Sequence, residues 1–302
     1  MRKFSVVASA LALIAMTSVC AGSDWIENFE EAKAKASKEG KDLLIDFTGS
    51  DWCGWCIKLK EEVFDKDAFV IEAKKNFIFV ELDFPRGKAQ TADIKVQNER
   101  LQGQFAIQGF PTIVLADAKG RPYAKTGYQP GGPEAYLRHL GELQRHKAKR
   151  DELFTEAEKL QGVEKAKALD KVLEHLAHLE LVDGYTDVMK QIVELDANNE
   201  AGLRGKVGTR VKLIEAGSLA QSGKSDDALR LLNAEVATGL PKDEDLLRIH
   251  FLRAQILNNK GDEPGTLKAL KQARDAAPNS DDSKKIAEII EQVMKESAKR
   301  GR

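Results

Sequence analysis

The chain has 302 residues and a net charge of −1 at pH 7, with 42% hydrophobic and 31% charged residues. This balance gives no electrostatic basis for binding nucleic acid or an anionic membrane. The length predicts about two domains, and the apolar content is sufficient for the cores of a soluble protein.

The N-terminus has the features of a secretory signal peptide. Two basic residues precede an uncharged run over residues 4–19, which is too short for a transmembrane helix, and Ala21 offers a small residue for cleavage. We therefore predict a signal peptide over residues 1–21 and an exported, periplasmic protein. The alternative is a lipid anchor on Cys20, although Val19 is bulkier than that processing usually accepts.

The first predicted elements are a helix and a buried strand. The helix begins at Asp24 or the residue before it and ends at Gly40, because an apolar stripe recurs at helical spacing before a glycine stop. The strand over residues 41–48 is almost continuously apolar, which favours a central strand covered on both faces. Asp46 is its exception. It is either an aspartate at the surface or a partly buried acid of raised pKa that accepts a proton from Cys56.

Two cysteines at i and i+3 follow this strand in the segment Trp52–Cys56. Cys56, Leu59 and Val63 then share one face of a predicted helix. Cys53 falls at the N-terminus of this helix, where unpaired N–H groups and the dipole lower a thiol pKa below its free value of about 8.5. Cys56 lies one turn further and is shielded. The pair therefore predicts a redox-active dithiol, which needs no other cofactor.

Two structural interpretations of the cysteine pair compete with this one. A zinc site needs about four ligands, but the only other cysteine lies in the leader and every histidine lies at or beyond His139. We therefore predict no metal site. A purely structural disulfide would close a loop too short to stabilise the fold strongly.

The remaining elements of the N-terminal half alternate between helix and strand. In order, the pattern predicts a short helix over 65–76, strands over 77–82 and 112–115, a helix over 93–105 between them, an antiparallel strand over 121–126 and a helix over 133–146. The loop over residues 85–88 should leave the same sheet edge as the cysteine turn. Its Arg86 and Lys88 are either solvated or in contact with substrate. Pro111 opens an apolar strand, which a cis peptide bond would explain.

This order of elements resembles the thioredoxin fold. The segments D-F-T-G-S-D-W-C-G-W-C, L-D-F-P and G-F-P-T-I are similar to those of exported bacterial thioredoxin-family proteins, over about residues 23–147. The resemblance implies that Cys53 attacks, that Cys56 resolves, that Asp46 is the buried acid and that Pro111 is the cis-proline beside the dithiol.

The resemblance also implies a substrate-binding surface. The backbone at Phe110 would pair with an extended substrate, and the other expected contacts are Trp52, Trp55 and Thr112. Trp55 is either a hydrophobic lid or a contact for apolar substrate segments. Cytosolic thioredoxins have Gly-Pro between their cysteines and a lysine beside the buried acid; here these places hold Gly-Trp and Phe79 or Glu81. The direction of electron flow therefore stays open.

The C-terminal half contains helix-forming residues without strand-like alternation. We predict an α/β thioredoxin-like domain over residues 22–147, followed by an all-α domain of helical hairpins over residues 148–302. Segments 219–229 and 257–267 align with each other and resemble degenerate tetratricopeptide repeats. Such repeats stack into a concave surface. The domain is then a spacer, a means of self-association into homo-oligomers, or a docking surface for a client.

Together these features predict an enzyme, a cell-envelope thiol–disulfide oxidoreductase. Its partners would be disulfide-containing protein substrates and an unidentified redox partner, and not nucleic acid. One alternative is a non-enzymatic, chaperone-like interaction protein built on a thioredoxin fold. Another is a metallochaperone that uses the dithiol for soft metals.

Overall fold

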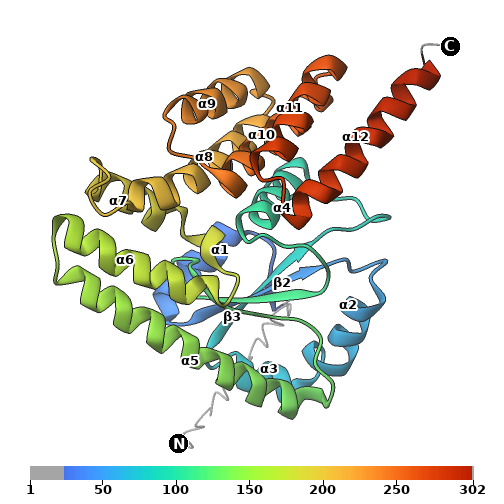
Figure 1. Ribbon diagram of the computed structural model, residues 1–302. Coiled ribbons are helices and arrows are strands. Elements are labelled where there is room, and N and C mark those ends of the chain that lie inside the picture. Colours follow the sequence, from blue (N-terminus) through green and yellow to red (C-terminus); the bar gives the residue numbers. More distant parts are fainter. Residues whose placement is uncertain (1–23, 301–302) are drawn as a thin grey trace, which may run out of the picture.

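A computed structural model describes residues 24–300 of the protein, with side chains as far as residue 295 (Figure 1). The predicted signal peptide and the alternative lipid anchor on Cys20 lie outside these residues. Among the helices described, none is both long and apolar enough to cross a membrane.

One five-stranded sheet organises the N-terminal half, in the order β1-β3-β2-β4-β5. The strands are β1 (Trp25–Ile26), β2 (Asp42–Thr48), β3 (Phe77–Asp83), β4 (Thr112–Ala116) and β5 (Pro122–Thr126). The central strand β2 is parallel to β3 and antiparallel to β4, and β5 forms an antiparallel pair with β4. All residues of β2 are buried, so the prediction of a central strand covered on both faces is confirmed.

Helices cover both faces of this sheet. They are α1 (Phe29–Glu39), α2 (Gly54–Leu59), the π-helical turn η1 (Lys60–Phe64), α3 (Asp67–Ala73) and α4 (Ala92–Gln104). Side chains of α1 and α4 pack with Leu43, Ile45 and Phe47 on one face. Leu44 packs on the other face with side chains of α2, η1 and α3. Because side chains alternate along a strand, Asp46 points to the same face as Leu44.

The predicted start of the first helix is wrong. Trp25 lies in β1, where it is in register with Phe79 of β3, and the helix begins at Phe29. Asn28 is the N-cap, because its side chain accepts a hydrogen bond from the Glu31 N–H. Asn28 and Glu31 have the spacing of a capping box, which marks the start of a helix. The apolar residues Trp25 and Ile26 extended the helical pattern backwards and hid this signal.

The described part of the C-terminal half is helical. Its elements are α5 (Gly132–Glu158), α6 (Gly162–Ala177), the 3₁₀ turn η2 (Val182–Tyr185), α7 (Thr186–Leu195), α8 (Leu203–Gln221), α9 (Ser225–Ala237), α10 (Asp243–Asn259), α11 (Glu263–Ala276) and α12 (Asp281–Arg300). In Figure 1 this half runs from α5 at the bottom, through α6 at the left, to the later helices at the top. The two aligned segments are the turns of hairpins α8–α9 and α10–α11. Helix α5 continues through residue 147, the predicted domain boundary.

The helical half is fixed to the edge strand β5. Arg150 of α5 is 2% exposed and donates hydrogen bonds to the Arg121 carbonyl and the Tyr185 hydroxyl. The Tyr185 hydroxyl in turn donates to the Pro122 carbonyl. A Cβ atom at Gly184 would lie 2.5 Å from Pro122 Cγ, so only glycine permits this close approach. These contacts hold η2 directly against β5.

Candidate active site

The two cysteines lie at the start of α2, as the sequence predicts. Cys53 is the N-cap of the helix, and its Sγ accepts a hydrogen bond from the Cys56 N–H at 3.2 Å. The two sulfurs form a disulfide with an S–S distance of 2.11 Å. Cys53 is 7% exposed and Cys56 is 4% exposed. The outer sulfur is therefore within reach only of a substrate that fits closely around it.

Two aspartates that the sequence analysis did not single out hold the turn before Cys53. Asp83, at the end of β3, accepts hydrogen bonds from the Ser50 N–H at 2.8 Å and from the Ser50 hydroxyl at 2.6 Å. Asp51 accepts from the backbone N–H groups of Arg86 and Gly87, and these bonds lower its pKa. The loop over residues 85–88 therefore does share the sheet edge of the cysteine turn.

Trp52, the residue before Cys53, is anchored on both sides of its ring. Its Nε1–H donates to the Phe84 carbonyl at 2.8 Å, and the guanidinium of Arg86 lies 3.9 Å from the ring centroid. A Cβ atom at Gly49 would lie 2.6 Å from the indole, so a glycine is required beneath it. The ring packs edge-on against Phe110, with centroids 5.8 Å apart. Trp52 therefore connects the turn that carries the cysteines to the loop over residues 109–112, which we call the proline loop.

Trp55, between the cysteines, is 57% exposed. Its ring lies 5.1 Å from that of Tyr128, and the ammonium of Lys58 lies over both rings. The Tyr128 hydroxyl donates to Glu62 at 2.6 Å. Tyr128 lies in a loop far from the cysteines in sequence, so no local pattern could have identified it. More than half of the Trp55 surface therefore stays accessible to a ligand.

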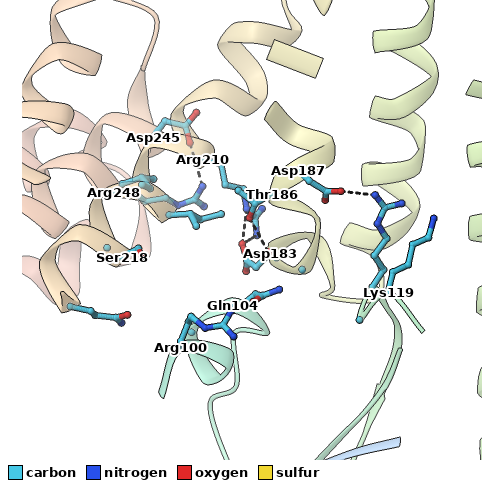
Figure 2. Close-up of a pocket in the computed structure, with 18 residues that line it drawn as sticks. Arg100, Gln104, Lys119, Asp183, Thr186, Asp187, Arg210, Ser218, Asp245 and Arg248 are labelled. Atoms are coloured by element: carbon cyan, nitrogen blue, oxygen red, sulfur yellow. Dashed lines mark hydrogen bonds and ion pairs between the residues drawn. The ribbon is translucent and has the colours of Figure 1, made fainter. Parts of the chain in front are cut away.

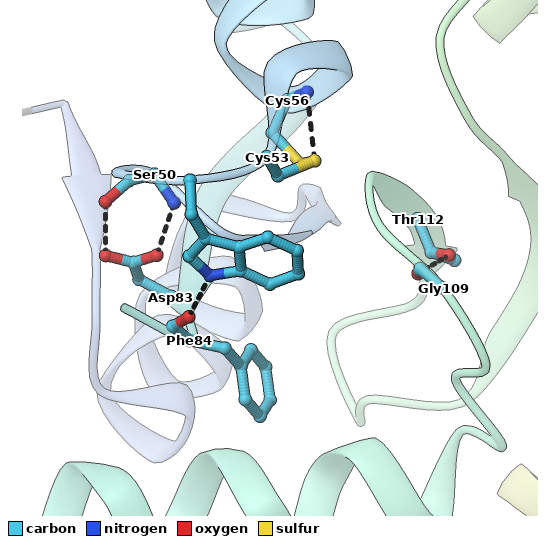
Figure 3. The surroundings of a disulfide bond; sticks show 8 residues. Ser50, Cys53, Cys56, Asp83, Phe84, Gly109 and Thr112 are labelled. Carbon is cyan, nitrogen blue, oxygen red and sulfur yellow. Dashed lines mark hydrogen bonds between the residues drawn. A yellow bond between two sulfur atoms is a disulfide. The ribbon is translucent and has the colours of Figure 1, made fainter. Parts of the chain in front are cut away.

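The proline loop completes the surroundings of the disulfide. The Phe110–Pro111 peptide bond is cis, as expected. The Thr112 hydroxyl donates to the Gly109 carbonyl at 2.8 Å, and Figure 3 shows these two residues across from the disulfide. The structure thus gathers Trp52, Phe110 and the loop around Pro111 at one sheet edge with the cysteines.

Asp46 is a buried carboxyl, so the interpretation as a surface aspartate is wrong. It lies on the central strand in register with Ile113, two residues beyond Pro111. Burial raises its pKa well above the ordinary value, and the neighbouring charge of Glu81 raises it further. Glu81 forms a 3.6 Å ion pair with Lys60, and Asp46 Oδ1 has no hydrogen-bond partner among the described residues.

The described residues of the site provide two sulfur atoms and a buried carboxyl. Among residues 24–295, no three His, Cys, Asp or Glu side chains lie close enough together to hold a metal ion. The site instead combines a disulfide at a helix N-terminus, a buried acid of raised pKa and a cis-proline loop. Such a combination suits exchange between the cysteine pair and an external thiol or disulfide.

Comparison with known proteins agrees with this geometry. A family model described as a thioredoxin-like domain matches residues 29–143. The disulfide bond reductase DsbH of Chlamydia pneumoniae is 36% identical over 111 residues, which cover 37% of this chain and 67% of that protein. The thioredoxin-related protein DsbJ of the same organism is 30% identical over 103 residues, covering 34% of this chain and 30% of DsbJ.

Two further matches also have names from thiol–disulfide chemistry. The thiol:disulfide interchange protein DsbD of Campylobacter jejuni is 28% identical over 105 residues, 35% of this chain and 17% of DsbD. A solved DsbH oxidoreductase structure has 31% identity and a TM-score of 0.39, and the match covers 45% of this chain and 95% of that one. The chain belongs to the thioredoxin-like family, and within it to the thiol–disulfide oxidoreductases.

Proposed function

We propose that the protein reduces disulfide bonds in other proteins, with Cys53 as the attacking thiol and Cys56 as the resolving thiol. The observation that carries this proposal is the placement of Cys53 as the N-cap of α2, at the sheet edge that also holds the cis-proline loop. The unpaired N–H groups and dipole of a helix N-terminus stabilise a thiolate. The disulfide bond reductase DsbH, named for that activity, supports the direction of electron flow.

In the first step, the Cys53 thiolate attacks one sulfur of the substrate disulfide. A bond forms between Cys53 Sγ and that sulfur, the substrate S–S bond breaks, and the departing substrate thiolate takes up a proton. In the second step, Cys56 loses its proton and attacks Cys53 Sγ, which releases the second substrate thiol. The cysteine pair is oxidised by two electrons, and a dithiol donor must reduce it again.

Asp46 is proposed to accept the proton from Cys56. A general base works best when its pKa lies near the working pH, and burial has raised the pKa of Asp46 in that direction. Its side chain points to the face of the sheet that α2 covers. The ion pair of Lys60 with Glu81 places a charged group beside it, where thioredoxins have a lysine.

Pro111 and its neighbours are proposed to hold the substrate. The backbone at Phe110 would pair with an extended segment around the reacting cysteine, as an added strand does at a sheet edge. Trp52, Trp55 and Thr112 would contact the side chains of that segment. The exposed part of Trp55 is the part of this surface that suits an apolar side chain.

The test compares single cysteine variants on a disulfide-bonded model protein. Cys53→Ser should abolish reduction and form no adduct. Cys56→Ser should accumulate a mixed disulfide through Cys53, seen as a mass increase in non-reducing mass spectrometry. The matched control is the Cys53→Ser/Cys56→Ser protein, which lacks both thiols. Wild-type rates in this control would overturn the proposal, and an adduct on Cys56 in Cys53→Ser would reverse the two roles.

The protein is further proposed to act after export, with a helical domain that recruits clients or partners. The basic and apolar leader supports export. The hairpins α8–α9 and α10–α11 support the tetratricopeptide-like assignment. Mass spectrometry of the mature N-terminus distinguishes cleavage after Ala21 from lipid attachment at Cys20. Light scattering determines whether the helical domain mediates self-association.

A further inference from the structure

The helical half and the thioredoxin-like half enclose a cleft between them (Figure 2). Its main hollow has a volume of about 850 Å³. On the thioredoxin-like side it is lined by Arg100 of α4 and by Lys119 of the β4–β5 turn. On the helical side it is lined by residues of η2, α8 and α10, among them Asp183 and Arg248. Each half of the protein therefore supplies one wall.

The main hollow has a neighbour at the proline loop. A second hollow of about 500 Å³ is lined by Gly109 and Thr112 of the proline loop, and it shares Asp183 and Arg210 with the main hollow. The smaller hollow thus lies at the loop across from the disulfide (Figure 3). The main hollow extends between the two halves of the protein.

The carboxylates in the main hollow are already paired. The three ion pairs are Arg210–Asp183 at 2.7 Å, Arg121–Asp187 at 2.6 Å and Arg248–Asp245 at 3.4 Å. Two further cations line the same hollow. In the described part of the chain, Arg100 bonds only to the amide oxygen of Gln104, at 3.4 Å, and Lys119 has no ion pair. Both side chains are exposed. The residues that line the main hollow therefore include two more cations than carboxylates, in a chain whose net charge is −1.

The walls of the cleft are held in place before any ligand arrives. The Lys125 ammonium of β5 donates to the Glu180 carbonyl at 3.1 Å, and the Arg121–Asp187 pair joins the two walls. Arg150 and Tyr185 add the buried contacts described above. A site whose walls are already fixed loses little conformational entropy when it binds.

We infer that this cleft binds an extended, acidic segment of the client polypeptide, with client carboxylates pairing to Arg100 and Lys119. The inference rests on the proposed function, because the same client presents its disulfide to Cys53. A polypeptide is favoured over a small anion because only a chain can occupy the proline loop and the distant cations together. An extended chain advances about 3.3 Å per residue, so client residues on one side of the reacting cysteine would pass the smaller hollow and enter the main one.

The experiment uses peptides with one cysteine in mixed disulfide with 2-mercaptoethanol. A block of four glutamates or four glutamines lies on either side of that cysteine. Rates are measured with the reduced, full-length mature protein at low salt. We expect kcat/KM about fivefold higher for the best glutamate peptide than for its glutamine counterpart, as for two exposed ion pairs. The preference should fall as salt screens the charges.

The test variant is Arg100→Ser/Lys119→Ser, which should lose the preference for glutamate and keep the rate on the glutamine peptides. Its matched control is Arg138→Ser/Lys38→Ser. These two cations are also exposed and without an ion pair in the described part of the chain, but neither lines the cleft. The control should keep the preference.

A neutral small disulfide, 2-hydroxyethyl disulfide, separates the two ways of failing. If the protein reduces neither this compound nor any peptide, the proposed function fails. If it reduces the small disulfide and shows no glutamate preference, or if the Arg100→Ser/Lys119→Ser protein retains that preference, the acidic client segment is overturned and the proposed function stands.

Discussion

Asp46 in the sheet and Arg150 at the junction of the two halves are both buried ionisable residues. They differ in how many hydrogen-bond and ion-pair partners surround them. Asp46 has one carboxylate oxygen without a hydrogen-bond partner among the described residues and a like charge, Glu81, on the next strand. Arg150 donates to two oxygens and pairs with Asp117 and Asp151 at 3.0 and 2.6 Å.

The difference separates a reactive group from a structural one. A buried charge without partners makes folding less favourable, and the protein lowers that cost by taking up a proton. A buried charge with all its partners keeps its charge and fixes the parts that it joins. Asp46 is therefore suited to exchange a proton near the disulfide, and Arg150 is suited to hold the helical half against β5.

Replacing Arg150 should have the largest effect on stability. Arg150→Met removes the shared partner of Asp117 and the Tyr185 hydroxyl, and we expect the free energy of unfolding to fall by about 3 kcal/mol. Urea titration measures this change. The control is Lys149→Met, because Lys149 is exposed and its replacement should change stability by no more than about 0.5 kcal/mol. Equal effects of the two would show that the junction does not depend on the buried charge.

Replacing Asp46 should lower the activity and raise the stability. If Asp46 accepts the Cys56 proton as proposed, Asp46→Asn should turn over about 100-fold more slowly at pH 7, while formation of the mixed disulfide by Cys53 continues. Stopped-flow kinetics distinguish the two steps. An unchanged rate of resolution would remove Asp46 from the mechanism.

The stability effect of Asp46→Asn should depend on pH. The unfolded carboxyl has a pKa of about 3.9, and burial raises the folded pKa. Between these two values the native state binds more protons, so the stability of the wild type falls as the pH rises. Asp46→Asn has no carboxyl at this position, so its stability does not fall with pH for this reason. It should match the wild type near pH 4 and be more stable by about 1–3 kcal/mol at pH 8.

The exposed Asp65 provides the control for this titration. Asp65→Asn should change the free energy of unfolding by no more than about 0.5 kcal/mol at either pH. A stability difference for Asp46→Asn that does not grow between pH 4 and pH 8 would contradict the assignment of a raised pKa.

Gly184 tests how closely the halves approach each other, and Gly141 provides its control. Gly184→Ala would put a Cβ atom 2.5 Å from Pro122 Cγ, and we expect a loss of about 2 kcal/mol from overpacking. Gly141 lies within α5, and a Cβ atom there would meet nothing within 4 Å. Gly141→Ala should therefore add about 0.5–1 kcal/mol. Thermal denaturation measures both, and a neutral Gly184→Ala would show that the contact between η2 and β5 is loose.

The local pattern of the sequence was sufficient to predict most of the sheet. Strands β2 and β3 were predicted from apolar runs, and the antiparallel strand β5 was predicted from the turn before it. The pattern failed at Trp25, because a strand of two residues has no period of its own. Strand β1 forms because it pairs with the edge of β3. There Trp25 packs against Phe79 of β3 and Phe64 of η1.

The site likewise contains residues that local sequence predicted and residues that it did not. The spacing of Cys53 and Cys56 places both sulfurs on the first turn of a helix, and Pro111 opens the next strand along that edge. Tyr128, Asp51 and Asp83 were not predicted. Each contacts the site across the fold, and its own sequence neighbourhood is that of an ordinary loop or strand end.

The sequence alone determined a cysteine pair at a helix start, the thioredoxin-like order of elements and an all-helical second half. Those features depend on the spacing of neighbouring residues, which local geometry converts directly into structure. Only the tertiary structure decided that one oxygen of the buried Asp46 has no hydrogen-bond partner among the described residues and that Arg150 joins the two halves. It also decided that two exposed cations line a cleft beside the proline loop. These depend on residues distant in the chain, whose contacts and charges are defined only after the chain has folded.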